Sequence, residues 1–137
     1  MTKEPRVGST AWLRFIYRFL NKEFFDNKLP KRLPVVWAKL PGTLMARVRW
    51  RSYRTVTRGK GKRGKRPLVI DTRHVPLIMQ IDRRLKGQHL QKQVGMSMVH
   101  EMAHLVLGVH VECTEWGGKF DRLMFRLCRK GAFQRFW

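Results

Sequence analysis

Apolar side chains recur at helical spacing over residues 9–26, which predicts an amino-terminal helix with one apolar face. That face contains Trp12, Phe15, Ile16, Phe19, Leu20, Phe24 and Phe25. Ser9 or Thr10 can cap the first turn of this helix. We expect the helix to end near Asp26, because two Leu-Pro pairs follow and each proline disfavours helical geometry at the residue before it.

Extended segments follow the first helix. Residues 35–37 predict a short strand, and Pro41-Gly42 predicts the turn after it. The side chains of residues 46–51 alternate in character, so this segment predicts a strand with one apolar and one cationic face. The apolar face has Ala46, Val48 and Trp50, and the cationic face has Arg47, Arg49 and Arg51.

A segment rich in glycine and cations, residues 59–66 (GKGKRGKR), comes after this strand. Three glycines and five cations cannot pack in a core, so the segment predicts a mobile hairpin loop. Residues 68–71 predict the return strand of the hairpin. Residues 73–88 predict a connection with helical character at 77–85.

Two more helices are predicted in the second half of the chain. Residues 90–107 are apolar on nearly every side, which is typical of a helix buried at the centre of a domain. Residues 118–130 carry an apolar stripe, and Gly131 can end that helix. Together the elements predict one α+β domain over residues 1–137, in which a small antiparallel-type sheet with a basic hairpin accompanies the helices.

The composition adds a strong charge imbalance, because 30 Lys and Arg against nine Asp and Glu give a net charge of +21. Solubility alone does not require so much charge, so a polyanionic partner is expected. Nucleic acid fits better than a membrane surface, because the charge is spread along the chain and no amphipathic terminal helix gathers it. The chain lacks a signal-peptide pattern and a long apolar run, so we expect an intracellular protein, cytoplasmic or nucleoid-associated.

The predicted central helix contains His100-Glu101-Met102-Ala103-His104, an HExxH motif. Residues four apart lie on one face of a helix, so both imidazoles can reach one zinc ion. Glu101 lies about 100° round the helix from His100, where its carboxylate can hold a water molecule and take its proton. The alternative is a pair of core histidines with a salt-bridged Glu101, but three ionisable groups in one apolar turn are costly without a shared ligand.

This motif and several other segments resemble the SprT-like (Spartan) zinc metalloprotease domains. Residues 20–30 (LNKEFFDNKLP) resemble the first-helix segment of the family, and residues 35–40 with the following Gly42 resemble its first strand and turn. Residues 99–107 (VHEMAHLVL) resemble its metal-binding helix, and residues 117–124 resemble the start of its next helix. The resemblance implies a zincin-like α+β fold, a bound Zn²⁺ and proteolysis of proteins on DNA.

At the position of the family's third zinc ligand, this chain has a different residue. The family usually has a histidine just before a glycine, and this chain has Trp116 before Gly117, whose indole cannot bind zinc in this way. The nearby candidates are His110, Glu112, Cys113 and Glu115. His110 is favoured, because it lies six residues after His104, the offset at which metzincin proteases place their third histidine.

The cations of the predicted strand and loop form a candidate nucleic-acid interface. They are Arg47, Arg49, Arg51, Lys60, Lys62, Arg63, Lys65 and Arg66. Alternate residues on a strand are about 6.8 Å apart, close to the phosphate spacing along one nucleic-acid strand. We therefore expect sequence-independent binding to DNA or RNA, and the alternative is a solvated basic hairpin that binds neither.

The sequence thus predicts a zinc metalloprotease that hydrolyses peptide bonds of nucleic-acid-associated proteins and is held on DNA by its basic surface. His100, His104 and His110 are the predicted zinc ligands, and Glu101 is the predicted catalytic base. One alternative is a catalytically inactive SprT-like protein that acts as a basic nucleic-acid-binding or structural component. Another is a metalloprotease whose basic surface docks on an acidic protein or a membrane.

Overall fold

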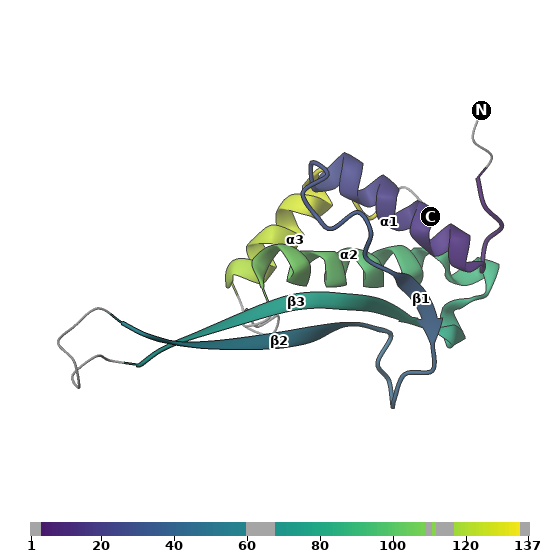
Figure 1. The fold of residues 1–137 in the computed structure, drawn as a ribbon. Coiled ribbons are helices and arrows are strands. Elements are labelled where there is room, and N and C mark those ends of the chain that lie inside the picture. Colours follow the sequence, from purple (N-terminus) through teal and green to yellow (C-terminus); the bar gives the residue numbers. More distant parts are fainter. Residues whose placement is uncertain (1–3, 60–67, 109–110, 112–116, 135–137) are drawn as a thin grey trace.

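The computed structural model of this chain describes residues 4–59, 68–108, 111 and 117–134. In these residues, three α-helices lie over one side of a three-stranded sheet (Figure 1). The elements are α1 (Thr10–Phe24), β1 (Val35–Ala38), β2 (Ala46–Arg58), β3 (Leu68–Asp82), the 3₁₀ helices η1 (Arg83–Leu85) and η2 (Gln88–Leu90), α2 (Gln91–Leu107) and α3 (Lys119–Arg129). The predicted α+β class is confirmed. No helix in the described residues is both long and apolar enough to cross a bilayer.

The first helix, α1, begins and ends close to the predicted positions. The Ser9 hydroxyl caps it by accepting a hydrogen bond from the Trp12 backbone N–H at 3.1 Å. Asp26 and the residue after it take left-handed φ values of 52° and 57°, which end the helix. The Asn21 side chain then exchanges two hydrogen bonds with the Leu29 backbone. These bonds fix the path of the chain from α1 toward the sheet.

The sheet has the strand order β1-β3-β2, with β3 in the centre. β2 pairs with β3 antiparallel, whereas β1 pairs with β3 in parallel through residues 35–38. The predicted antiparallel type is therefore corrected to a mixed sheet. The physical reason is that the chain reverses before and after β2, so β1 and β3 run in the same direction.

The central strand β3 is far longer than the strand predicted at residues 68–71. It continues to Asp82, so the predicted connection over 73–88 with helical character at 77–85 is wrong apart from the short turns η1 and η2. Residues 79–82 pair with β1 on one side, and β2 lies along the other side. These ladders between distant segments outweigh the helix-like local spacing.

A β-bulge interrupts the β2–β3 ladder between Arg49 and Trp50 of β2. Arg49 pairs with Ile78 and Trp50 pairs with Pro76, which leaves Leu77 as the extra residue on β3. A bulge tolerates a proline within a ladder and increases the local twist. The bulge therefore accommodates Pro76 within the central strand.

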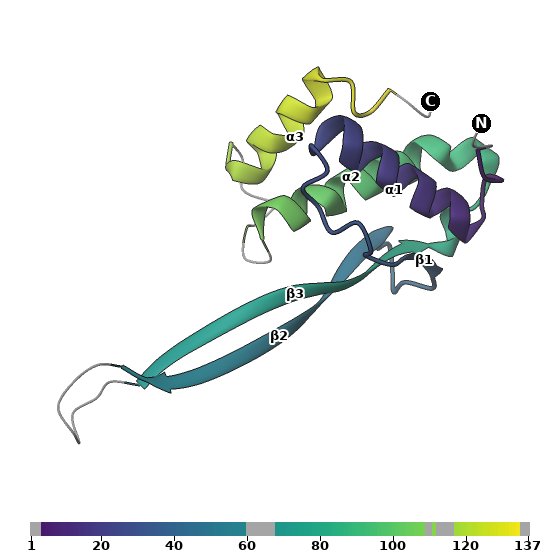
Figure 2. The same cartoon turned by 45° about the horizontal axis from the view of Figure 1, so that its top comes forward.

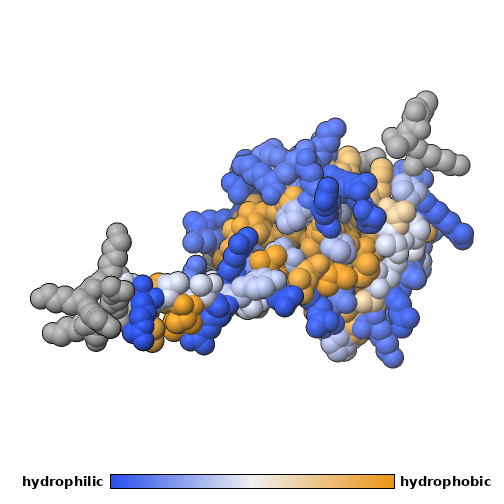
Figure 3. Space-filling view, in the orientation of Figure 1, coloured by the Kyte–Doolittle hydropathy of each residue, from blue (hydrophilic) through white to orange (hydrophobic). Residues whose placement is uncertain are grey.

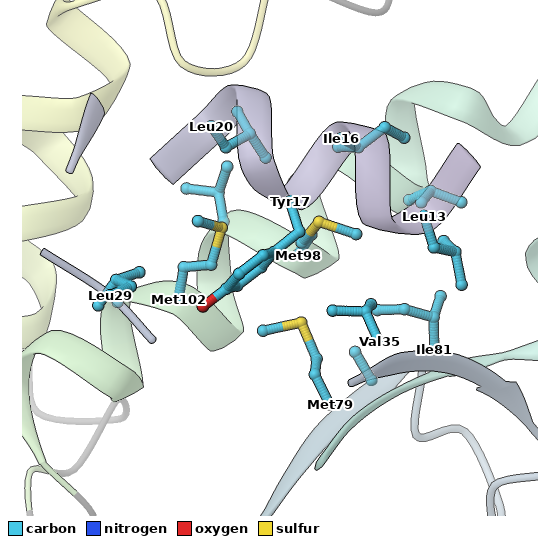
Figure 4. Packing of buried hydrophobic residues seen from close by; sticks show 14 of the residues in the cluster. Leu13, Ile16, Tyr17, Leu20, Leu29, Val35, Met79, Ile81, Met98 and Met102 are labelled. Atoms are coloured by element: carbon cyan, nitrogen blue, oxygen red, sulfur yellow. The ribbon is translucent and has the colours of Figure 1, made fainter. Parts of the chain in front are cut away.

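The core lies between α1, α2 and the root of the sheet. Figure 4 shows buried side chains of α1 and α2 pointing toward those of β1 and β3. They include Leu13, Ile16, Tyr17 and Leu20 of α1, Met98 and Met102 of α2, and Val35, Met79 and Ile81 of the sheet. The helix α2, predicted as buried at the centre of the domain, contributes buried residues to this core but is not buried throughout, because Met96 and Val106 are 44% and 47% exposed.

Asp82 fastens the end of β3 to the segments beside it. Its carboxylate accepts hydrogen bonds from the backbone N–H of Leu40 at 3.1 Å and of Arg84 at 2.8 Å. It also accepts two from the Arg84 guanidinium, at 2.8 and 3.0 Å, and this guanidinium donates a further bond to the Leu44 carbonyl at 3.2 Å. The loop before β2 is therefore anchored to the end of β3.

Beyond the bulge, β2 and β3 leave the body of the protein as a two-stranded arm (Figures 1 and 2). We call residues 51–58 of β2 and 68–75 of β3 the hairpin arm. Its residues 51–58 and 68–73 are all exposed. A 2.7 Å hydrogen bond between the Ser52 hydroxyl and Nδ1 of His74 links the two strands near the base. The predicted mobile loop at 59–66 falls, apart from Gly59, outside the described residues.

Candidate active site

The HExxH residues lie in the second half of α2, where this helix faces α3 and the start of β2. The rings of His100 and His104 stand one turn apart, with centroids separated by 5.0 Å and planes inclined by 66°. Both rings are half-buried. The helix therefore brings the two predicted metal ligands together on one face.

Phe120 of α3 packs against both imidazoles. Its ring centroid lies 4.7 Å from that of His100 and 4.6 Å from that of His104. The left-handed φ of Gly117 and a 3.1 Å hydrogen bond from its N–H to the Asp121 carboxylate shape the entry into α3, so Phe120 lies in the first turn. This contact restricts rotation of the two rings.

Burial keeps both imidazoles neutral near pH 7. It lowers the pKa of His100, which the neighbouring His104 lowers further, and burial also lowers the pKa of His104. A neutral imidazole offers its ring nitrogen lone pair to a metal ion, whereas an imidazolium does not. The pair is therefore in the ligand form at neutral pH.

Glu101 is buried beside the two histidines and is only 9% exposed. Burial raises the pKa of its carboxyl to about 7, although a hydrogen bond from the Val48 backbone N–H acts in the opposite direction. A carboxyl with a pKa near the working pH can both accept and release a proton. Because Val48 belongs to β2, the carboxylate also links α2 to the edge of the sheet.

An open and largely apolar cleft of about 390 Å³ borders His100 and Glu101. Its other lining residues come from the segment entering β2, from α2, and from α3 and the residues after it: Leu44, Met45, Ala46, Met96, Ser97, Met124 and Phe133. The cleft can accommodate an apolar side chain next to the candidate catalytic carboxyl. Neither the lining of this cleft nor the Phe120 contact is predictable from local sequence, because the contributing segments are far apart in the chain and have no shared local pattern.

The two imidazoles fit one zinc ion. Two histidines on a tetrahedral zinc, with Zn–N distances of about 2.0–2.1 Å, have ring centroids about 5 Å apart. The observed separation of 5.0 Å agrees with this arrangement. Within the described ranges, no group of three or more His, Cys, Asp and Glu side chains is placed to hold a metal ion. The candidate third ligands His110, Glu112, Cys113 and Glu115 lie outside those ranges, as does Trp116, so the third ligand stays a prediction.

Ala46 and Val48 of β2 face the core. Because neighbouring residues of a strand point to opposite faces, the predicted nucleic-acid residues of β2 lie on the face turned away from the helices. These residues are Arg47, Arg49 and Arg51. Nε of Arg47 donates a 2.7 Å hydrogen bond to Gln80. The arginine row and the imidazoles therefore occupy different sides of the sheet. The loop cations Lys60, Lys62, Arg63, Lys65 and Arg66 lie outside the described residues.

The raised pKa of Glu101 predicts a pH-dependent loss of stability in the metal-free protein. A carboxyl whose folded pKa exceeds its unfolded value of about 4.3 stabilises the fold fully below that value and loses this contribution as the pH rises toward 7. We expect Glu101→Gln to raise the free energy of unfolding by roughly 2 kcal/mol at pH 8 and to change it little at pH 4, measured by urea unfolding in EDTA.

Glu23→Gln, at an exposed position of α1, is the matched control. The two histidines also titrate in this pH range, so the quantity to compare is the difference between variant and unaltered chain. Equal stability of Glu101→Gln and the unaltered chain at pH 8 would contradict the burial of a charged Glu101.

Comparisons of the chain with protein-family models, with curated proteins and with solved structures found no match. The residues and geometry of the site therefore carry the functional proposal.

Proposed function

We propose that this chain is a zinc-dependent metalloendopeptidase of the SprT-like type that acts on proteins bound to nucleic acid. The observation that carries the proposal is that the rings of His100 and His104 have centroids 5.0 Å apart and that the buried Glu101 follows His100 in the same helix. His100 and Glu101 border an open apolar cleft. Three ionisable groups in one half-buried helical turn are explained by a shared ligand and a shared reaction.

His100 and His104 are the proposed zinc ligands, and Phe120 holds their rings in place. The third ligand is proposed to come from residues 110–115, with His110 favoured for its spacing. When bound, zinc polarises the scissile carbonyl and makes a water molecule more acidic.

Glu101 is the proposed general base. Its carboxylate would take a proton from the attacking water and pass it to the departing amine. In the metal-free chain, burial raises the pKa of this carboxyl to about 7. The Val48 backbone N–H holds this carboxylate against β2, so the base has a fixed position relative to the edge of the sheet.

The substrate chain is proposed to lie along β2. β2 is at the edge of the sheet, and in the described residues no further strand pairs with its outer side. An extended peptide can bind to such an edge through backbone hydrogen bonds, with one side chain in the apolar cleft. Residues 44–46 border that cleft at the start of β2.

The net charge of +21 supports the nucleic-acid part of the proposal. A protease held on DNA or RNA meets bound proteins at a high effective concentration, which supplies selectivity without a specific peptide sequence. The arginines along β2 and the hairpin arm provide described cations for this contact.

Zinc content tests the proposal directly. Elemental analysis of the purified chain, after incubation with zinc and dialysis, is expected to give about one zinc per chain, and His104→Ala is expected to lose most of it. His110→Ala and Glu115→Ala identify the third ligand if either loses the metal. His89→Ala, which alters an exposed histidine outside the site, is the control and should keep the metal. An unaltered chain that retains no zinc would overturn the enzymatic proposal.

A second candidate function is nucleic-acid binding without catalysis. It is favoured by Trp116, which stands where the family usually has a zinc-binding histidine, and by the excess of cations. In that case the metal would be structural or absent, and Glu101 would have no role in any activity.

A further inference from the structure

The hairpin arm is an unusual feature for a chain of this size, because a two-stranded ribbon without a third strand or a helix behind it gains little stability by itself. Its eight residue pairs extend about 27 Å at about 3.4 Å per residue. Val56 and Ile70 are 54% and 51% exposed although they are apolar. Figure 3 shows hydrophilic and apolar residues together on this projecting part of the surface. These properties indicate a binding element.

The pairing register distributes four arginines evenly over the two faces of the arm. Residues directly opposite each other in an antiparallel ladder share a face. One face continues the core side of the sheet and carries Arg54 and Arg58, with the Val56–Ile70 pair between them. The other face carries Arg51 and Arg73. The described part of the arm has one acidic residue, Asp71, against these four cations.

We infer that the hairpin arm enters the major groove of duplex DNA. This inference deepens the nucleic-acid part of the proposed function and is independent of the hydrolytic part. The major groove is about 12 Å wide and admits a two-stranded β-ribbon, whose strands are about 4.8 Å apart. Phosphates line both walls of the groove, so cations on both faces of the arm each meet a negative charge.

The apolar residues fit the same site. Thymine presents its methyl group in the major groove, where apolar side chains make contact with it. The Val56–Ile70 pair lies between Arg54 and Arg58 on one face of the arm. On the wall of the groove that this face meets, the apolar pair is placed for thymine methyl groups and the flanking arginines for the phosphates. Arg51 stacks on Tyr53, with 5.1 Å between its guanidinium carbon and the ring centroid, and this contact holds the arginine out along the arm.

Other partners fit the arm less well. A flat membrane surface would meet only one face, and binding there would require that face to be apolar. A second copy of the chain would bring arginines together, which like-charge repulsion disfavours. Duplex RNA has a deep, narrow major groove that excludes such a ribbon.

The test compares two double variants that each remove two charges from one face of the arm: Arg54→Gln with Arg58→Gln, and Arg51→Gln with Arg73→Gln. The control is Arg14→Gln with Arg18→Gln, which removes two exposed charges from α1. Binding of the full chain to a labelled 30-base-pair DNA duplex is followed by fluorescence anisotropy in EDTA at several salt concentrations. Duplex RNA and single-stranded DNA of the same length are measured beside it.

We expect each arm variant to bind the DNA duplex roughly tenfold more weakly near 0.15 M salt and to reduce the slope of log K against log salt by about 2. The α1 control should change the slope by less than half as much. Duplex RNA should bind at least about tenfold more weakly than duplex DNA to the unaltered chain. All variants should keep the circular dichroism spectrum and Tm of the unaltered chain, because the substituted side chains are exposed.

Unchanged DNA affinity in both arm variants would overturn the inference, and so would equal binding of duplex RNA. Stronger binding to phosphatidylserine vesicles than to DNA, or dimerisation through Val56 and Ile70 in sedimentation, would also overturn it. Because the binding assay contains EDTA, its outcome does not depend on hydrolysis. A chain that binds DNA but cleaves nothing would leave the inference standing and reject the protease proposal.

Discussion

Replacing Glu101 with glutamine is expected to lower the rate of peptide hydrolysis about 10²- to 10⁴-fold while the protein keeps its zinc. Glutamine has nearly the same shape as glutamate but cannot accept the proton of the attacking water. The two imidazoles and Phe120 are untouched, so the metal ligands keep their arrangement. The measurement is cleavage of a histone on duplex DNA, followed by gel electrophoresis, together with zinc analysis of the same samples.

Glu23→Gln is the control for this experiment, because it removes the same functional group from an exposed position of α1. The control should cleave as fast as the unaltered chain. The rival function, nucleic-acid binding without catalysis, predicts that Glu101→Gln leaves every measurable activity intact. Loss of cleavage with retained zinc separates the two functions in one comparison.

The second large effect is expected at Asp82. Asp82→Ala should lower the free energy of unfolding at pH 7 by roughly 3 kcal/mol, because a carboxylate only 2% exposed accepts four hydrogen bonds from Leu40 and Arg84. Half of the Arg84 side chain is exposed, so water compensates part of the loss. Urea unfolding of the two proteins measures the difference.

The same residue predicts a loss of stability in acid. Hydrogen bonds from the Arg84 side chain hold the pKa of the Asp82 carboxyl well below its usual range. A lowered folded pKa contributes stability above the unfolded value of about 3.9, and this contribution is lost as the pH falls below it. The unaltered chain should therefore lose its advantage over Asp82→Asn as the pH falls below about 4. Asp71→Asn, on the exposed arm, should stay within about 0.5 kcal/mol of the unaltered chain at pH 7.

The helices of this fold are predictable because their signals are local. The apolar stripe of residues 9–26, the Ser9 cap and the glycine stop at Gly131 all act within one or two turns. At the end of α3, the left-handed φ of Gly131 is 87°, and the next N–H returns to the Leu127 carbonyl at 3.0 Å. Local spacing therefore contains most of the information for these elements.

The strand β3 is not predictable in this way. Residues 77–85 have apolar positions that also suit a helix, and Pro76 suggests a break in any strand. The strand exists because it pairs with β1 and β2, which lie 22 or more residues earlier in most of their pairs, and because a bulge accommodates Pro76. Such pairing has no signature in the segment itself.

The residues of the candidate site also differ in whether local sequence predicts them. His100, Glu101 and His104 stand within five residues, so their spacing alone predicts a common face. Phe120 and the apolar wall at 44–46 approach them only through the fold. Local sequence therefore predicts the candidate reacting groups, whereas only the tertiary structure brings the cleft beside them.

β2 is a single strand that begins at the candidate cleft with Ala46 and ends at the far end of the described arm with Arg58. Thirteen residues at about 3.4 Å each span roughly 40 Å. Under the two proposals, one end of this strand borders the cutting site and the other lies in the DNA groove. The strand would then act as a molecular ruler, because its length sets how far from the duplex a peptide bond must lie to be cut.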